Sequence, residues 1–157
     1  MTSQVLRRQV RPEWIDYNGN LSEAYYVLVF GFATDEAMEL IGIDEQYRTS
    51  TNCSLYTVEA HVRYLAEVQA DSELVVTTRL VGAGSKKLRI CHEMTVAGTL
   101  VATEEILAVH VDSLHGRAAP FPDEVANRID ELLEAVPDYA GRSIAQPTPG
   151  RSARGGR

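Results

Sequence analysis

The sequence predicts an α+β fold in which a curled antiparallel sheet surrounds one long helix. Residues 23–41 have the length of a helix, and their first half, AYYVLVFGFA, has no polar stripe. Four segments that alternate apolar and polar residues follow, and short turns connect them, as in an antiparallel meander. Because such a helix needs cover on most of its circumference, the sheet must curve around it.

The elements are expected in the order strand, helix, four strands and short helix. Residues 4–10 predict a strand that ends before Pro12. The long helix begins after Ser22, a good N-cap residue, and ends at Gly42, the residue type that most often follows a helix. The other four strands of the five-stranded sheet are expected at 55–66, 73–81, 87–96 and 100–112, and the C-terminal amphipathic helix begins near Pro122.

Two details of the pattern bear on packing. Gly31, inside the long helix, costs about 1 kcal/mol relative to Ala, which predicts that another backbone packs closely there. His92 is in phase with apolar neighbours and is expected to be a satisfied interior histidine.

An unbroken alternation along 55–66 would place one set of residues on one face and a second set, Glu59, His61 and Arg63, on the other. The first set is Tyr56, Val58, Ala60, Val62 and Tyr64.

Length and composition predict one domain, residues 1–136, followed by a flexible tail, residues 137–157. The chain has 157 residues, 45% hydrophobic and 24% charged, which suffices for a core without metal ions or disulfides. The tail is rich in Pro, Gly, Ser and Arg, and its alternative role is a weak anion-binding arm. Its charge of +3, against −7 overall, leaves the domain at −10. An acidic domain predicts no nucleic-acid partner, because phosphates need clustered Lys and Arg.

The sequence also predicts a cytoplasmic protein without cofactors. The longest apolar run, residues 24–33, is far shorter than the roughly 20 residues of a membrane span, so no membrane partner is expected. No signal-peptide pattern opens the chain, and Cys53 and Cys91 are expected to be free thiols. The four histidines lack metal-ligand spacing, and no P-loop, GxGxxG or GxSxG motif is present, so neither a metal nor a cofactor is expected.

The stretch DYNGNLSEAYY, residues 16–26, resembles the signature of the hotdog-fold acyl-CoA thioesterases of the 4-hydroxybenzoyl-CoA thioesterase-like group. The resemblance extends from about Val5 to Asp112. It implies a hotdog fold, a homodimer or a dimer of dimers, and an acyl-CoA substrate. The chain departs from the family at Asn20, where His is common, and at Ser22, where Asn is common. The positions that match the signature are Asp16, Asn18, Gly19, Asn20 and Tyr26.

A narrower resemblance concerns the thioesterases of bacterial carnitine breakdown, which act on betainyl-CoA. It lies in PEWIDYNG, residues 12–19, and in EAYYVLVFGFATDEAMELIGI, residues 23–43. The resemblance makes betainyl-CoA the candidate substrate.

Asp16 is the candidate catalytic residue, and the resemblance implies a role as nucleophile or general base. A carboxylate near a helix N-terminus tends to stay ionised, and the free N–H groups of the first helical turn can polarise a thioester carbonyl. The alternative is that Asp16 only closes a turn with Asn18 or Gly19.

Residues around this turn and on the strand 55–66 are the candidates for substrate binding. Aromatic rings can surround a quaternary ammonium group at about 0.5–2 kcal/mol per ring, and Glu59 is the candidate acid beside it. Tyr26 and Tyr64 are expected to be core or interface residues instead. The alternative for the whole set is ordinary turn, core or solvated positions. The set is Trp14, Tyr17, Asn18, Gly19, Asn20, Tyr25, Tyr56, Glu59 and His61.

Three basic residues follow a Gly-rich turn, and the resemblance implies that they hold the CoA phosphates. They are Lys86, Lys87 and Arg89, with Arg63 as a weaker candidate. The alternative is a solvated turn.

The leading hypothesis is an acyl-CoA thioesterase that works as a homodimer, since one helix does not cover such a sheet. A hotdog dehydratase or hydratase usually needs a histidine with an acid on the helix, and this helix contains no histidine. A non-catalytic acyl-CoA-binding or regulatory dimer is an alternative. So is a cone-shaped α+β barrel for small hydrophobic ligands, which usually has more helix before the meander.

Overall fold

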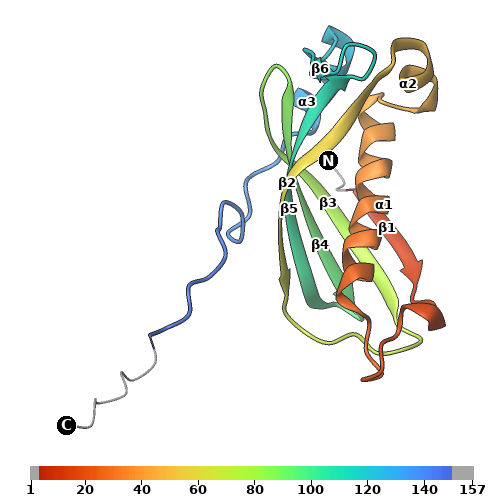
Figure 1. Ribbon diagram of the computed structural model, residues 1–157, viewed down its shortest axis with the longest axis vertical. Helices are drawn as coiled ribbons and strands as arrows, with labels where there is room; N and C mark the ends of the chain where they lie inside the picture. Colours follow the sequence, from red (N-terminus) through yellow and green to blue (C-terminus); the bar gives the residue numbers. More distant parts are fainter. Residues whose placement is uncertain (1–3, 150–157) are drawn as a thin grey trace.

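A curled antiparallel sheet packs against one long helix in the computed structural model, which describes residues 4–149 (Figure 1). The strand order is β1–β3–β4–β5–β2, and every neighbouring pair is antiparallel. A short strand, β6, extends the sheet beside β5 and was not expected from the sequence. The strands are β1 (Gln4–Gln9), β2 (Cys53–Tyr64), β3 (Glu73–Ala83), β4 (Lys87–Val96), β5 (Thr99–Asp112) and β6 (Arg117–Ala118).

The long helix α1 (Glu23–Ile41) has the predicted bounds. It ends at Gly42, whose φ of 92° is left-handed and suits glycine. A second helix, α2 (Glu45–Thr51), was not predicted, although Asp44 caps it by accepting a hydrogen bond from the Tyr47 N–H at 2.8 Å. A short 3-10 helix (Pro12–Trp14) precedes α1, and α3 (Asp123–Leu132) follows the sheet. None of the helices in residues 4–149 is long and apolar enough to cross a membrane.

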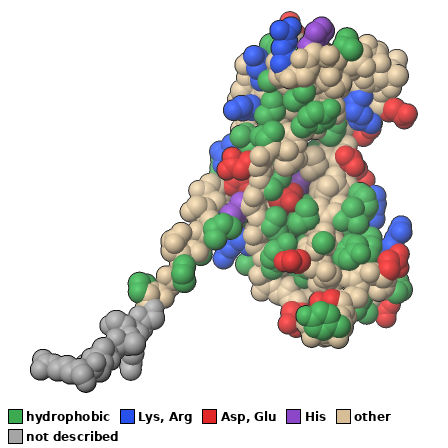
Figure 2. Space-filling view, viewed as in Figure 1, with side chains coloured by type: hydrophobic (Ala, Val, Ile, Leu, Met, Phe, Trp, Pro, Cys, Tyr) green, Lys and Arg blue, Asp and Glu red, His purple; other side chains and the backbone are tan. Residues whose placement is uncertain are grey.

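One flank of α1 has no cover from the residues that the structure describes, 4–149. Val27 and Leu28 are 42% and 40% exposed, and a Cβ added at Gly31 would meet nothing within 4 Å. The expectation that a backbone packs against Gly31 is therefore wrong for the single chain. Figure 2 shows hydrophobic side chains at the surface on the face that carries α1. Apolar side chains of α1 are thus exposed on this flank.

A β-bulge in β2 overturns the unbroken alternation expected for this strand. The register with β5 shifts between Thr57 and Glu59, so that Tyr56 lies opposite Val109 and Glu59 lies opposite Leu107. Val109 and Leu107 are two residues apart and share a face, so Tyr56 and Glu59 share one as well. Tyr56 therefore points away from the inner face that α1 covers.

The interior histidine is confirmed. His92 is fully buried, and its two ring nitrogens lie 2.8 Å from the hydroxyls of Thr34 and Thr78. Glu104, opposite His92 on the neighbouring strand, is also buried, with its carboxylate 4.0 Å from the ring. The thiols of Cys53 and Cys91 are free. The centre of the sheet thus contains a buried polar pair on its helix side.

The segment after α3 lies against the opposite, outer face of the sheet. Glu134 donates its N–H to the Leu80 carbonyl at 2.8 Å, and the Gly141 N–H bonds to the Glu105 carboxylate. Tyr139 is partly buried, and burial raises the pKa of its phenol, with Cys91 nearby adding to the shift. The first residues of the predicted tail therefore contact the sheet, while its last eight residues lie outside the described part of the chain.

Candidate active site

The loop before α1 orients the Asp16 carboxylate. The Asp16 N–H bonds to the Asn20 carbonyl at 2.8 Å, and the Gly19 N–H bonds to the Asp16 carbonyl at 3.0 Å. Gly19 has a φ of 80°, which explains the glycine in this turn. Oδ1 of Asp16 accepts the N–H groups of Asn18 at 2.8 Å and Asn20 at 3.2 Å. The turn expected as an alternative is present, and it leaves Oδ2 without a hydrogen bond to any residue in 4–149.

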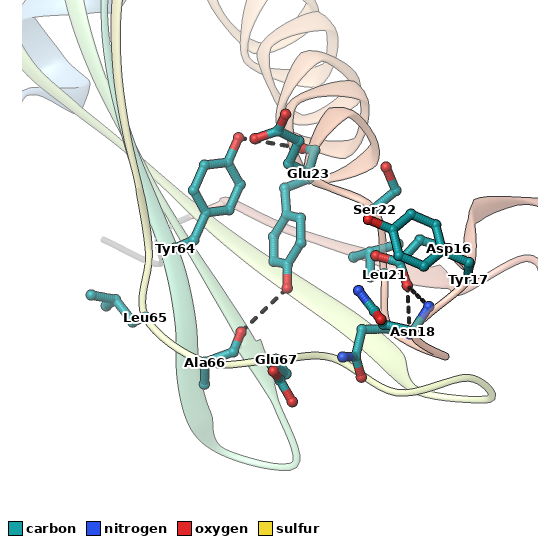
Figure 3. A pocket seen from close by; sticks show the side chains of 12 residues that line it. Asp16, Tyr17, Asn18, Leu21, Ser22, Glu23, Tyr64, Leu65, Ala66 and Glu67 are labelled. Carbon is teal, nitrogen blue, oxygen red and sulfur yellow. Dashed lines mark hydrogen bonds between the residues drawn. The ribbon is translucent and has the colours of Figure 1, made fainter.

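A pocket of about 620 Å³ opens beside this carboxylate (Figure 3). The loop before α1, the first turn of α1 and the segment that follows β2 form its walls. Its lining residues are Asp16, Tyr17, Asn18, Asn20, Leu21, Ser22, Glu23, Tyr26, Tyr64, Leu65, Ala66 and Glu67.

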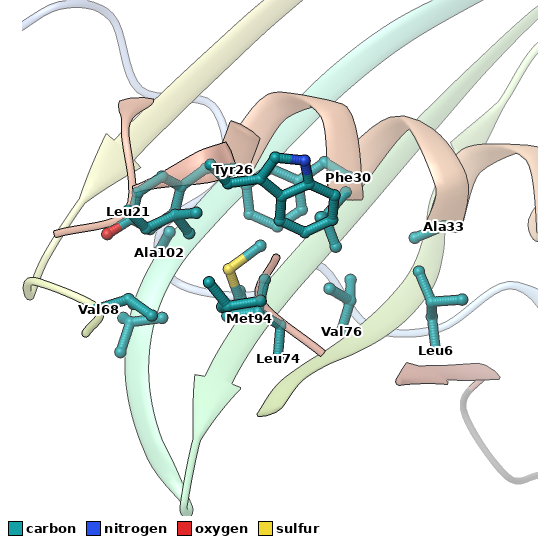
Figure 4. Close-up of a cluster of buried hydrophobic side chains, with 14 residues drawn as sticks. Leu6, Leu21, Tyr26, Phe30, Ala33, Val68, Leu74, Val76, Met94 and Ala102 are labelled. Carbon is teal, nitrogen blue, oxygen red and sulfur yellow. The ribbon is translucent and has the colours of Figure 1, made fainter. Parts of the chain in front are cut away.

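Buried residues anchor both walls of the pocket. Leu21 and Tyr26 are 4% exposed and belong to the cluster of apolar side chains under the start of α1 (Figure 4). The Leu21 N–H bonds to the Val68 carbonyl at 2.7 Å, and Asn20 forms a β-bridge with Gln69. The pocket is therefore held by the core on two sides.

The N-terminus of α1 offers free backbone donors to the pocket. Ser22 is the N-cap residue as predicted, but its hydroxyl makes no capping hydrogen bond and instead lines the pocket. The Tyr25 N–H bonds to the Ser22 carbonyl at 3.0 Å, which removes one of the three donors of the first turn. The N–H groups of Glu23 and Ala24 precede any intrahelical hydrogen bond and can donate to a ligand oxygen.

Tyr26 is a core residue as expected, and both Tyr26 and Tyr64 also line the pocket. Their rings meet edge to face, with centroids 5.1 Å apart and planes at 87°. The Tyr26 hydroxyl donates to the Ala66 carbonyl at 3.2 Å, and the Tyr64 hydroxyl donates to the Glu23 carbonyl at 3.3 Å. Burial raises the pKa of both phenols, and the Glu67 and Glu23 carboxylates respectively add to the shift. Both side chains are neutral at physiological pH.

The other aromatic candidates do not surround the pocket. Tyr17 lines it but is 97% exposed. Trp14 is buried and stacks on Tyr25 with ring centroids 5.6 Å apart, and the Arg11 guanidinium lies over the Trp14 ring at 5.7 Å. Tyr56 lies on the outer face because of the bulge. The structure therefore does not bring Trp14, Tyr25 and Tyr56 to Asp16.

Glu59 and His61 lie on the outer face of the sheet, away from Asp16. They line a second pocket of about 380 Å³ with Arg89 and residues 141–143. Arg89 pairs with Glu105 at 2.9 Å there.

The two remaining basic candidates, Lys86 and Lys87, are exposed at the turn between β3 and β4. This turn is at the opposite end of the sheet from the start of α1 (Figure 1). The candidates for CoA binding and for catalysis are thus far apart within one chain. No cluster of three or more metal-binding side chains occurs in residues 4–149.

Sequence reasoning missed Glu67 and the residues before it. They follow β2 and reach the pocket because the end of β2 lies beside the start of α1, where the Tyr64 hydroxyl donates to the Glu23 carbonyl. No local spacing in the sequence signals that proximity.

Comparison with known proteins identifies the family. Residues 10–129 match the family model of the thioesterase-like superfamily. The chain belongs to this superfamily. The match spans the loop with Asp16, strands β2 to β6 and most of α3, and it confirms the predicted resemblance.

Curated relatives in the superfamily include a protein named betainyl-CoA thioesterase from Pseudomonas aeruginosa PAO1. It is 41% identical over 155 residues, which cover 92% of this chain and 98% of the relative. A protein named L-carnitine dehydrogenase/betainyl-CoA thioesterase from Agrobacterium fabrum is 41% identical over 140 residues. That match covers 86% of this chain but 29% of the relative, which is much longer.

Solved structures confirm the hotdog-type α+β fold. A Pseudomonas putida KT2440 protein assigned as a thioesterase superimposes with a TM-score of 0.82 at 37% identity, over 94% of this chain and 99% of its own. A Staphylococcus aureus protein, determined in complex with CoA, superimposes with a TM-score of 0.85 at 24% identity, over 94% and 98% of the two chains. Fold, family and enzyme class, a thioester hydrolase, therefore agree with the sequence predictions.

Proposed function

We propose that the chain hydrolyses a small acyl-CoA thioester, betainyl-CoA, to betaine and CoA, and that Asp16 is its catalytic carboxylate. The observation that carries the proposal is the position of Asp16, in a pocket beside the unpaired N–H groups at the start of α1. Relatives that match most of this chain carry the betainyl-CoA thioesterase name, which supports the choice of acyl group.

The geometry suits the two halves of thioester hydrolysis. Two backbone N–H groups orient Oδ1 of Asp16, so Oδ2 can attack the carbonyl carbon or take a proton from an attacking water. The N–H groups of Glu23 and Ala24 can stabilise the negative charge that develops on the carbonyl oxygen. The C–S bond then breaks and CoA leaves as a thiol. Asp16 returns the proton in the general-base route, whereas in the nucleophilic route water hydrolyses an Asp16 anhydride.

The substrate assignment is tested by CoA release from a panel of thioesters. The panel contains acetyl-CoA, butyryl-CoA, 4-hydroxybenzoyl-CoA and betainyl-CoA, assayed at equal concentrations with the wild-type enzyme. We expect kcat/KM for betainyl-CoA to exceed that for each of the others by at least about tenfold. Release from none of them, by a folded protein that still binds CoA, would instead favour a non-catalytic acyl-CoA-binding module.

A cytoplasmic homodimer completes the proposal, formed along the edge strand β2. This edge has no strand partner among the described residues, and Tyr56, Val58 and Tyr64 on it are 46%, 59% and 46% exposed. Val27 and Leu28 on the open flank of α1 are further exposed apolar residues. Antiparallel pairing of two β2 edges reverses the partner sheet, so its turn between β3 and β4 comes to the Asp16 end of this chain. Lys86 and Lys87 of one chain can then hold the CoA bound to the other.

The dimer interface is tested with a charge on each edge of the sheet. We expect Val58→Arg to convert the dimer to monomers in light scattering, because an unpaired charge at the centre of an apolar interface is costly. Val5→Arg is the matched control, since Val5 is 48% exposed on β1 at the opposite edge. A Val58→Arg variant that remains dimeric, or a monomeric wild type, would contradict this interface.

A further inference from the structure

The pocket beside Asp16 has the charge of a site for a cation. Three of its twelve lining residues are carboxylates, namely Asp16, Glu23 and Glu67. None of the twelve, all within the described chain, is Lys, Arg or His. Three others are tyrosines, and aromatic faces attract positive charge. A positively charged acyl group therefore gains more from this lining than a neutral group of the same shape.

Two tyrosine rings form a fixed corner in the pocket. Tyr26 and Tyr64 meet at 87°, and each hydroxyl is tied to a backbone carbonyl. The edge of one ring meets the face of the other, and Tyr26 is 4% exposed, so Tyr64 is the ring of the pair that a ligand can reach. Tyr64 keeps 46% of its surface exposed, so its ring is accessible to a ligand. The corner offers rigid apolar contact that needs no rearrangement on binding.

Glu67 supplies a negative charge next to this corner. It directly follows Ala66, whose carbonyl accepts the Tyr26 hydroxyl at 3.2 Å. The proximity is also visible in the pKa of Tyr26, which burial raises most and which Tyr64 and Glu67 raise further. The Glu67 carboxylate forms no ion pair or hydrogen bond with any residue in 4–149. Its charge is therefore available to a ligand.

We propose that Glu67 and Tyr64 select an acyl group that ends in a quaternary ammonium. Such a group has no N–H to donate, so it is recognised by charge and by contact with its methyl groups, the two properties that this lining provides. The inference rests on the proposed function, because Asp16 must act on the thioester of the same bound substrate. Glu59, the acid favoured from the sequence, lies on the outer face and cannot take this role within the chain.

A matched pair of substrates isolates the charge. Betainyl-CoA and 3,3-dimethylbutyryl-CoA have the same branched shape, but a neutral carbon replaces the quaternary nitrogen in the second. We expect the wild-type enzyme to prefer betainyl-CoA in kcat/KM, and Glu67→Gln to reduce that preference at least about tenfold. Activity toward 3,3-dimethylbutyryl-CoA should be retained. Tyr64→Leu should reduce the preference in the same direction, and Glu59→Gln should leave it unchanged.

The outcomes separate this inference from the proposed function. Hydrolysis of both thioesters with a preference that neither Glu67→Gln nor Tyr64→Leu alters would overturn the inference and leave the thioesterase intact. If no thioester is hydrolysed, the proposed function fails, and NMR titration with tetramethylammonium chloride still tests the pocket. Saturable shifts of the Tyr64 ring signals that are weakened in Glu67→Gln would support the inference, and their absence would overturn it.

Discussion

Asp16→Asn is expected to lower kcat for betainyl-CoA by more than about 100-fold without unfolding the protein. Asparagine has the size of aspartate, and its Oδ1 can still accept the N–H groups of Asn18 and Asn20 that close the turn. It can neither attack the carbonyl nor take a proton from water. The measurement is CoA release under saturating substrate, together with the thermal midpoint of the same sample.

A second substitution separates chemistry from structure at this position. Asp16→Ala removes the turn hydrogen bonds as well, and we expect it to cost about 1–2 kcal/mol of stability in addition to activity. Glu13→Gln is the control, because Glu13 is exposed on the same loop, outside the pocket. If Asp16 served only the turn, Asp16→Asn would retain activity within about tenfold while Asp16→Ala lost stability.

The fold could be predicted from local patterns because each pattern has one dominant physical cause. The apolar run with Ser22 before it and Gly42 after it set the bounds of α1, and period-two alternation set the strands. The helix α2 was missed because its seven residues, EQYRTST, have no apolar face, and only Asp44 signals its start. The bulge at Val58 could not be predicted either, because one extra residue in a strand does not change the kinds of residue that the strand contains.

The candidate site could be predicted only where its residues are neighbours in the sequence. Asp16 and the turn after it lie in one continuous stretch, so composition and turn chemistry were enough to single them out. Glu67 and Tyr64 come to the pocket through the register of β2 on β5, which depends on contacts distant in the sequence. The bulge decides that Tyr56 and Glu59 face outward. The positions of Glu67 and Tyr64 beside Asp16 are therefore set by the geometry of the sheet and not by a local sequence pattern.

The buried pair His92 and Glu104 predicts an unusual dependence of stability on pH. Both side chains lie between α1 and the sheet, where Phe30 stacks on the imidazole at 5.7 Å. Burial lowers the pKa of His92 to about 3 and raises the pKa of Glu104 to about 7. Both groups are therefore neutral in the folded protein near pH 6, although their separation of 4.0 Å would allow an ion pair. Desolvation of two charges outweighs their attraction at this distance.

Glu104 and His92 change the stability of the folded protein in opposite directions as the pH rises. Glu104 stays protonated in the folded state up to about pH 7 but ionises near pH 4.5 when the protein is unfolded. Its stabilisation of the folded state is therefore fully present below pH 4.5 and is lost as the pH rises through 7. His92 resists protonation in the folded state. Its stabilisation of the folded state is therefore fully present above pH 6.5 and is lost as the pH falls toward 3. Stability should therefore be greatest between about pH 5 and 6.5 and should decline on both sides.

Glu104→Gln should remove the alkaline decline and raise the free energy of unfolding at pH 8 by on the order of 3 kcal/mol, at 1.36 kcal/mol per pKa unit. Glutamine keeps the shape of the side chain but cannot ionise, so urea unfolding at pH 5, 6.5 and 8 should show a wild-type loss at pH 8 that the variant lacks. The acid decline from His92 remains in both proteins. Glu73→Gln, at an exposed pair with Arg7, is the control and should change stability by less than about 1 kcal/mol at each pH. A Glu104→Gln variant that is less stable than wild type at pH 8 would show instead that Glu104 is ionised in the folded protein and paired with a charged His92.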